Sequence, residues 1–181
     1  MSPLGVGWPN AISGLRILLV PVVVALVLVQ TRSASYAATA VFVAAGLSDF
    51  LDGYLARRFG TSTLTGAWLD PLSDKLLVAA AVISLAAVSR FPLWAAVVIV
   101  VREAAVSILR AYMGTRRASM PASRIAKWKT ATQLGAIGLY MLPLSASADV
   151  VKLTVLSIAI AITVYSGLDY FLHVSGRVRA R

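Results

Sequence analysis

The sequence predicts an all-helical integral membrane protein, a bundle of six transmembrane helices. Of its 181 residues, 59% are hydrophobic and 13% are charged, whereas a soluble globular domain has about 25% charged residues. The mean hydropathy is +0.84. A helix that crosses the hydrocarbon layer needs about 20 apolar residues, so we expect about six crossings in a single domain that covers residues 1–181.

The six predicted helices follow apolar stretches that are separated by polar residues. Before the first stretch, residues 1–10 include two prolines and Trp8. We expect this short amino-terminal segment to lie at the membrane interface, where tryptophan side chains sit at headgroup depth. The expected helices cover residues 11–30, 36–57, 70–89, 91–112, 129–147 and 152–174.

The basic residues are divided unequally between the two sides of this bundle. The chain has 17 Lys and Arg residues and a net charge of +10. If the amino terminus is cytoplasmic, the outer connections carry or flank only Arg32, Arg90 and Lys152. The positive-inside rule then predicts that both termini are cytoplasmic and that the protein is a multi-pass protein of the inner (plasma) membrane. The excess charge indicates contact with anionic lipid headgroups and no nucleic-acid partner.

The residue types exclude several classes of chemistry. The chain has no cysteine, which excludes disulfides, thiolate catalysis and Cys-ligated zinc. It has one histidine, His173, which excludes a multi-histidine metal site. Any chemistry must therefore use carboxylates, hydroxyls and cations.

Four of the seven acidic residues lie close together in the sequence, where the second predicted helix reaches the cytoplasm and the third leaves it. Asp49 and Asp52 are spaced i,i+3, and Asp70 and Asp74 are spaced i,i+4, so each pair lies on one helix face. Antiparallel neighbours can bring all four carboxylates together, where they would repel one another unless cations neutralise them. Oxygen ligands suit Mg²⁺ or Mn²⁺, and two such ions are typical of sites where a nucleophile attacks phosphorus.

The alternative for each of these acids alone is a solvated carboxylate at a helix end, or an ion pair with Arg57, Arg58 or Lys75. Gly53 favours the functional interpretation, because it lies one turn after Asp49 and one turn before Arg57. The same helix face then offers a carboxylate, bare backbone and a guanidinium, and a phosphate could approach closely there.

The pattern D-x-x-D-G-x-x-A-R-x8-G-x-x-x-D-x-x-x-D resembles the signature of the CDP-alcohol phosphotransferase family at every fixed position. In this chain those positions are Asp49, Asp52, Gly53, Ala56, Arg57, Gly66, Asp70 and Asp74. The resemblance implies a six-helix membrane fold, commonly homodimeric, with a cytoplasm-facing site for two metal ions. It also implies transfer of a phosphatidyl group from CDP-diacylglycerol to an alcohol, with release of CMP.

The resemblance also assigns roles to single residues. It implies that Asp49, Asp52, Asp70 and Asp74 hold the metal ions, with Asp74 as general base. Gly53 and Arg57 resemble the residues that receive CDP-diacylglycerol, and Thr63 is similar to a hydroxyl position in the nucleotide pocket, with Thr61, Ser62 and Thr65 as rivals. Residues 9–13 are similar to a P-N-x-x-[ST] motif, which places Asn10 and Ser13 near the same substrate. The alternative for Asn10 is a helix N-cap.

Basic residues in the second half of the chain narrow the choice of acceptor. The run through Arg102-Glu103, Arg110 and 127–130 resembles the branch of the family that uses glycerol 3-phosphate. An anionic acceptor held beside an anionic diphosphate needs several cations, and the candidates are Arg102, Arg110, Lys127 and Lys129. An ionisable residue as deep as Arg102 indicates a function. The alternative for Arg102 is an internal ion pair with Glu103 or another carboxylate.

Two other functions remain open on the sequence. A relative within the same family could use inositol phosphate or phosphatidylglycerol as acceptor, because the signature is common to the family. A cation transporter would also place carboxylates in a membrane bundle, although here they gather at one membrane face instead of lining a path.

Overall fold

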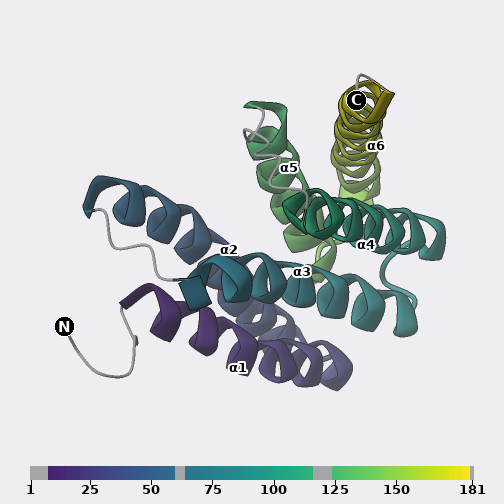
Figure 1. The fold of residues 1–181 in the computed structure, drawn as a ribbon. Helices are drawn as coiled ribbons and strands as arrows, with labels where there is room; N and C mark the ends of the chain where they lie inside the picture. Colours follow the sequence, from purple (N-terminus) through teal and green to yellow (C-terminus); the bar gives the residue numbers. More distant parts are fainter. Residues whose placement is uncertain (1–7, 60–63, 116–123, 180–181) are drawn as a thin grey trace. The chain divides into compact units, whose positions relative to one another are not determined.

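The computed structural model describes the backbone of residues 8–59, 64–115 and 124–179, and the side chains of residues 14–48, 73–113 and 128–172. Regular structure in the described residues is entirely helical (Figure 1). The predicted all-helical class with six long helices is confirmed. The elements are α1 (Trp8–Val29), α2 (Arg32–Phe59), α3 (Leu64–Ala87), α4 (Leu93–Thr115), α5 (Arg124–Met141), the short 3₁₀ helix η1 (Ala146–Ala148) and α6 (Asp149–Arg179).

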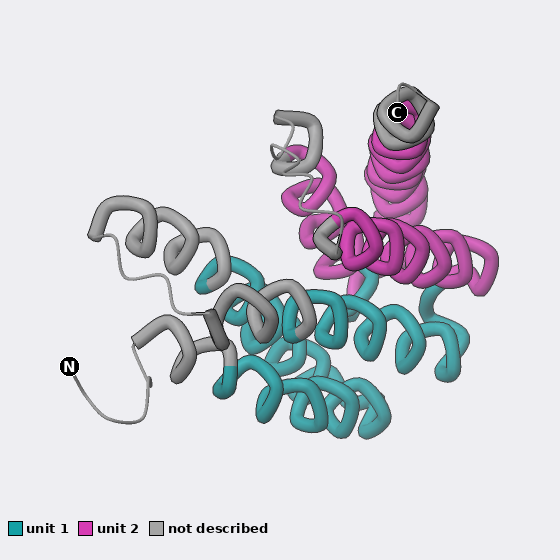
Figure 2. Tube along the Cα trace, in the orientation of Figure 1, with its two compact units in different colours: residues 1–91, 140–143 teal, residues 92–139, 144–181 magenta. Residues whose placement is uncertain are grey.

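The chain forms two compact units, residues 1–91 with 140–143 and residues 92–139 with 144–181 (Figure 2). In the first unit, α1 packs against both α2 and α3, and α2 contacts α3. The buried residues of α2 repeat at i,i+4 and i,i+3 and so lie on one face. These residues are Ala34, Ala38, Phe42 and Ala45, and the three alanines allow close approach of the neighbouring helices. Val23 and Val27 of α1 and Leu77, Ala81 and Leu85 of α3 complete this core.

In the second unit, α4 packs against α6, and α6 contacts η1. Its core combines Ala95, Ala96, Ile99 and Val106 of α4 with Ala136 and Ile137 of α5 and Leu156 and Ala159 of α6. The buried positions of α6 continue with Thr163 and Ser166, again at helical spacing. The core of the second unit thus changes from apolar side chains to polar ones along α6, at Thr163 and Ser166.

Large apolar side chains point outward along the described helices, as the exposed Leu18, Ile108 and Leu168 illustrate. One helical stretch among the described residues, Ala146–Leu172, is long and apolar enough to cross a membrane, and Gly14–Val29 is a shorter apolar helix. The presence of six helices is confirmed, whereas six membrane crossings and cytoplasmic termini stay predictions.

Several helix ends differ from the predicted ones. α1 begins at Trp8 instead of residue 11, so only residues 1–7 of the predicted interfacial segment lie outside the described part of the chain. α5 ends at Met141 instead of residue 147, because Pro143 follows and disfavours helical conformation in the residue before it. α6 begins at Asp149, whose carboxylate lies at the amino end of the helix and pairs with Lys152 at 3.0 Å.

Arg90 ties together three segments of the first unit. Its Nη1 donates to Ser35 Oγ at 2.8 Å and its Nη2 donates to the Met141 carbonyl oxygen at 2.8 Å. The preceding residue, Ser89, has a φ of 57°, which turns the chain sharply after α3. The neighbouring Phe91 packs edge-on against Tyr140, with ring centroids 4.9 Å apart.

Candidate functional site

The four predicted metal ligands lie on two helices that contact each other. Asp49 and Asp52 belong to α2, and Asp70 and Asp74 belong to α3. The side chain of Asp74 is described and is partly buried, whereas those of the other three aspartates lie outside the described residues. Among the side chains that the structure describes, no three Asp, Glu or His residues come together, and that set contains only one of the four predicted ligands.

The predicted CDP-diacylglycerol ligands also lie on helices of the first unit or beside them. Asn10 and Ser13 belong to α1, and Gly53 and Arg57 belong to α2, two helices that pack together. The side chains of these residues lie outside the described part, and Thr63 lies outside it altogether. Their assignment therefore stays a prediction.

Arg16 of α1 is the one buried arginine among the described side chains, with a relative exposure of 1%. Its guanidinium donates from Nε to the Ala45 carbonyl oxygen at 3.2 Å, from Nη1 to Ser73 Oγ at 3.1 Å and from Nη2 to Ser48 Oγ at 3.4 Å. These acceptors belong to α2 and α3, directly beside the acidic cluster. Our sequence reasoning assigned no role to Arg16, although a single cation inside an apolar stretch was the signal available.

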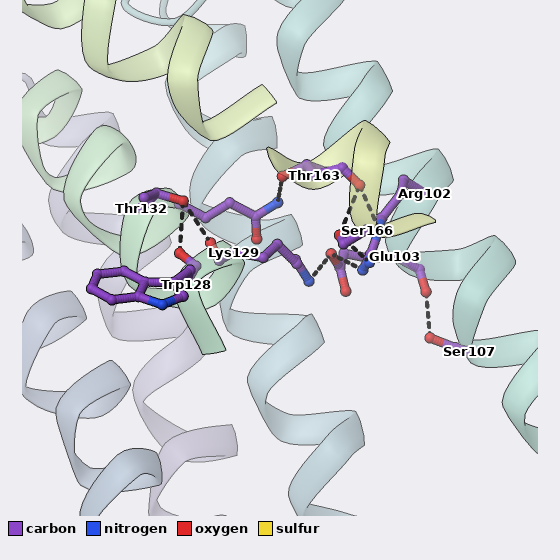
Figure 3. Close-up of polar contacts among 9 residues, drawn as sticks. Arg102, Glu103, Ser107, Trp128, Lys129, Thr132, Thr163 and Ser166 are labelled. Atoms are coloured by element: carbon purple, nitrogen blue, oxygen red, sulfur yellow. Dashed lines mark hydrogen bonds and ion pairs between the residues drawn. The ribbon is translucent and has the colours of Figure 1, made fainter. Parts of the chain in front are cut away.

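A second polar cluster lies in the second unit, where α4, α5 and α6 each contribute side chains (Figure 3). All three guanidinium nitrogens of Arg102 make polar contacts there. Nε donates to the Thr163 carbonyl oxygen at 3.2 Å, Nη2 donates to Ser166 Oγ at 2.8 Å, and Nη1 pairs with Glu103 Oε1 at 3.1 Å. These contacts are those of the internal ion pair that we gave as the alternative for Arg102. A direct contact between Arg102 and the acceptor stays a prediction.

Lys129 of α5 meets the same carboxylate. Its Nζ forms an ion pair with Glu103 Oε1, and Figure 3 shows Lys129 and Arg102 both directed at this oxygen. Lys129 is 8% exposed, and the neighbouring Gln133 donates from Nε2 to Thr163 Oγ1 at 2.8 Å. The structure thus brings together two of the four predicted acceptor ligands, on either side of one carboxylate.

The remaining two predicted acceptor ligands are placed separately. Arg110 is exposed on α4, and its guanidinium carbon lies 5.9 Å from the centroid of the Tyr170 ring, a cation–π contact. The phenol oxygen of Tyr170 is buried and has no hydrogen-bond partner among the described residues. Lys127 lies on α5, and its side chain is outside the described part. Sequence reasoning assigned no role to Tyr170.

Comparison with known proteins identifies the family of this chain. Residues 6–165 match the family described as CDP-alcohol phosphatidyltransferase. A "Probable phosphatidylglycerophosphate synthase" of Mycobacterium tuberculosis (strain H37Rv) is 39% identical over 164 residues, which cover 89% of this chain and 78% of that protein.

Two further relatives are named CDP-diacylglycerol–glycerol-3-phosphate 3-phosphatidyltransferase. The protein of Rickettsia typhi is 34% identical over 167 residues, or 90% of this chain and 94% of its own length. The protein of Pseudomonas fluorescens is 42% identical over 135 residues, or 71% of this chain and 69% of its own length. The match over residues 6–165, which includes the whole aspartate signature, and the similarity to these relatives agree, and the chain belongs to the CDP-alcohol phosphatidyltransferase family.

Proposed function

We propose that this chain transfers the phosphatidyl group of CDP-diacylglycerol to the sn-1 hydroxyl of glycerol 3-phosphate, giving phosphatidylglycerophosphate and CMP. The observation that carries this proposal is the complete aspartate signature on two helices in contact, α2 and α3, in a chain whose relatives bear the names of this activity. The acceptor follows from those names and from the basic residues of the second unit.

The four aspartates would hold two Mg²⁺ or Mn²⁺ ions. The donor set fits these ions, because carboxylate oxygens on two helices in contact are hard ligands and the chain has no cysteine to favour a softer metal. When bound, the ions supply charge neutralisation at the diphosphate and at the oxygens that enter and leave the phosphorus.

Asp74 would act as the general base. Its partly buried side chain on α3 accepts the proton of the acceptor hydroxyl, and that oxygen attacks the β-phosphorus of CDP-diacylglycerol. A new P–O bond to glycerol 3-phosphate forms, the bond between the β-phosphorus and the bridging oxygen breaks, and CMP leaves with the bonding electron pair. The transfer is a direct displacement and needs no covalent enzyme intermediate.

The remaining residues bind the two substrates. Gly53 and Arg57 of α2 would receive the diphosphate, with Asn10, Ser13 and Thr63 near the nucleotide or lipid end. The cations that we assign to the acceptor phosphate are Arg102, Arg110, Lys127 and Lys129. The meeting of Arg102 and Lys129 at Glu103 supports this assignment in part, because it brings two of the four assigned cations together.

We further propose that the chain is one membrane domain with six crossings, cytoplasmic termini and a site that opens to the cytoplasm, in the inner (plasma) membrane and as a homodimer. The unequal distribution of basic residues and the exposed apolar side chains of the helices support this topology.

The test is an assay of the purified protein with CDP-diacylglycerol and, side by side, radiolabelled glycerol 3-phosphate, inositol phosphate, phosphatidylglycerol and glycerol. We expect Mg²⁺-dependent release of CMP and fastest product formation with glycerol 3-phosphate. Asp74→Asn should lower kcat by about 100-fold or more, because a neutral amide can neither accept the proton nor balance the metal charge. Faster turnover with inositol phosphate would show that inositol phosphate, and not glycerol 3-phosphate, is the acceptor. CMP release without a metal would overturn the proposed metal site.

A further inference from the structure

We infer that Arg16 is a positioning residue for the carboxylate site: its guanidinium fixes the turns of α2 and α3 that carry Asp49 and Asp74. The inference rests on the proposed function, because it concerns the geometry that those carboxylates offer to divalent cations. No step of the proposed mechanism uses Arg16.

The position of Arg16 is costly for a cation. Its side chain lies on the same face of α1 as the buried Val23 and Val27, seven and eleven residues further on. An arginine keeps its charge in proteins, and a buried charge is tolerated only when hydrogen bonds satisfy it. An apolar side chain would fill this face at lower cost. The contacts of Arg16 therefore call for an explanation other than filling space.

Those contacts join two helices through one rigid group. Nη1 reaches Ser73 of α3 at 3.1 Å, whereas Nη2 reaches Ser48 of α2 at 3.4 Å. Because the guanidinium is planar, its donors keep fixed directions, and the two serine hydroxyls are held in a fixed relation to each other. A lysine ammonium at the end of a flexible stem could not impose the same relation.

The residues that Arg16 contacts lie next to the predicted metal ligands in the sequence. Ser48 directly precedes Asp49, and Ser73 directly precedes Asp74. The third acceptor, the Ala45 carbonyl oxygen at 3.2 Å, is the one that accepts the amide of residue 49 in a regular α-helix. Each contact is thus one residue or one backbone hydrogen bond away from a predicted ligand. Any rotation or slide of either helix at this turn would move a carboxylate relative to its partner across the site.

Another arginine of the same unit provides a comparison. Arg90 also joins separate segments, through Ser35 Oγ and the Met141 carbonyl oxygen. Neither acceptor has an acidic residue beside it in the sequence. If Arg16 only stabilised the fold, changing Arg16 and changing Arg90 should have the same effect on metal binding, and the two variants could differ only in stability.

The experiment measures Mn²⁺ binding to the purified full-length protein by electron paramagnetic resonance, without substrate and without reference to turnover. Arg16→Lys keeps the charge but loses the planar fork, and Ser73→Ala removes one acceptor and changes no charge. We expect the Kd for Mn²⁺ to rise about 10-fold in Arg16→Lys and a few-fold in Ser73→Ala, since residues that orient metal ligands typically contribute 10- to 100-fold to affinity.

Two matched controls separate positioning from general destabilisation. Arg90→Lys alters the comparable clamp away from the acidic residues. Ser84→Ala removes another buried hydroxyl of α3, one that donates to Ala81 of its own helix at 3.1 Å. Both control variants should bind Mn²⁺ like the wild type, whatever their Tm.

The outcomes are distinguishable. If Asp74→Asn weakens Mn²⁺ binding but Arg16→Lys and Ser73→Ala do not, the inference is wrong and the metal site stands. If the wild type binds no Mn²⁺, the metal site and the inference fall together. Should Arg16→Lys not fold, Ser73→Ala against Ser84→Ala decides: equal Kd values in that pair would also overturn the inference.

Discussion

Glu103 is the carboxylate at which two cations from different helices converge. Arg102 Nη1 lies 3.1 Å from Oε1, and Lys129 Nζ pairs with the same oxygen. The three side chains are only 10–14% exposed, so their charges are largely removed from water. Removing one partner of a buried ion pair leaves an uncompensated charge, which costs far more than the pair itself contributes.

We therefore predict that Glu103→Gln lowers the free energy of unfolding by about 3–5 kcal/mol, because it leaves the buried Lys129 and the largely buried Arg102 without their shared carboxylate. Thermal unfolding in detergent measures the effect. Asp149→Asn is the matched control, because Asp149 pairs with Lys152 at 3.0 Å but its side chain is 66% exposed. Because water solvates the exposed Asp149 carboxylate, this pair contributes about 0–1 kcal/mol, and the variant should unfold close to the wild-type Tm. Equal losses in both variants would contradict the prediction.

Removal of Arg57 and removal of Arg110 should each raise the KM for a different substrate. We predict that Arg57→Ala raises the KM for CDP-diacylglycerol, because its guanidinium is assigned to the diphosphate, and that Arg110→Ala raises the KM for glycerol 3-phosphate. A lost charge-assisted hydrogen bond costs about 1.5–3 kcal/mol, or roughly 10- to 150-fold in KM. Steady-state kinetics with each substrate varied in turn measure both effects.

Arg110 is the better probe of the acceptor site than Lys129. Arg110 is exposed, and its guanidinium contacts the ring of Tyr170. Lys129 also pairs with Glu103, so the removal of Lys129 would disturb the second unit. If Arg110→Ala changes the KM of CDP-diacylglycerol instead, the two arginines have been assigned to the wrong substrates.

The sequence predicted candidate site residues better than it predicted the contacts between them. The spacing of Asp49, Asp52, Asp70 and Asp74 predicts an acidic cluster, because helical periodicity relates sequence distance directly to a helix face. The same periodicity cannot say which residue of a distant helix faces a given side chain. The contact of Arg16 with Ser73 joins residues 57 positions apart, and the one between Arg102 and Ser166 joins residues 64 apart. Such partners depend on packing between helices.

At the element scale, the number and order of helices followed from the apolar stretches, whereas their ends did not. The sequence predicted that the fifth helix would continue through Pro143, because the hydropathy remains high there, but α5 ends at Met141. Conversely, α3 begins at Leu64 and α6 extends to Arg179, beyond the apolar stretches, since a helix can continue into polar sequence. Hydropathy therefore predicted the number and order of the helices better than their ends.

Two glycines, Gly135 and Gly167, differ in the space that helix packing leaves beside them. An added Cβ at Gly167 of α6 would lie 3.4 Å from both Cγ and Nε of Arg102, whereas an added Cβ at Gly135 of α5 would meet nothing within 4 Å. Gly167 is buried and Gly135 is exposed. The absence of a side chain at Gly167 thus leaves room for the arginine that bonds to Thr163 and Ser166.

We predict that Gly167→Leu displaces the Arg102 side chain and destabilises the protein by about 1–3 kcal/mol, as overpacking of a core does. Gly135→Leu should be neutral or stabilising by up to about 1 kcal/mol, because leucine has the higher helix propensity and the site is open. Thermal unfolding of the two variants in parallel measures the difference. A lower Tm for Gly135→Leu than for Gly167→Leu would contradict the prediction.

At the scale of the whole molecule, charge distribution and chemistry are related. The same excess of basic residues that predicts orientation also supplies the cations assigned to two anionic substrates. Both proposed substrates carry charged phosphate groups, which do not cross a bilayer unaided, so the site must open to the side on which they are supplied. The orientation of the bundle is therefore a requirement of the proposed reaction and can be tested apart from it.

The absence of cysteine from the chain makes that test direct, because a single introduced thiol is the only one present. Ser33 and Ser147 are exposed and belong to the predicted outer connections, and Ser62 lies in the sequence between α2 and α3, on the predicted cytoplasmic side. In right-side-out vesicles, a membrane-impermeant maleimide should label Ser33→Cys and Ser147→Cys, and should label Ser62→Cys only after the membrane is permeabilised. The cysteine-free wild type gives the background. Labelling of Ser62→Cys in sealed vesicles would place the aspartate signature on the outer side and would contradict the predicted orientation. Labelling of Ser33→Cys without Ser147→Cys would instead mean that an odd number of crossings separates the two connections.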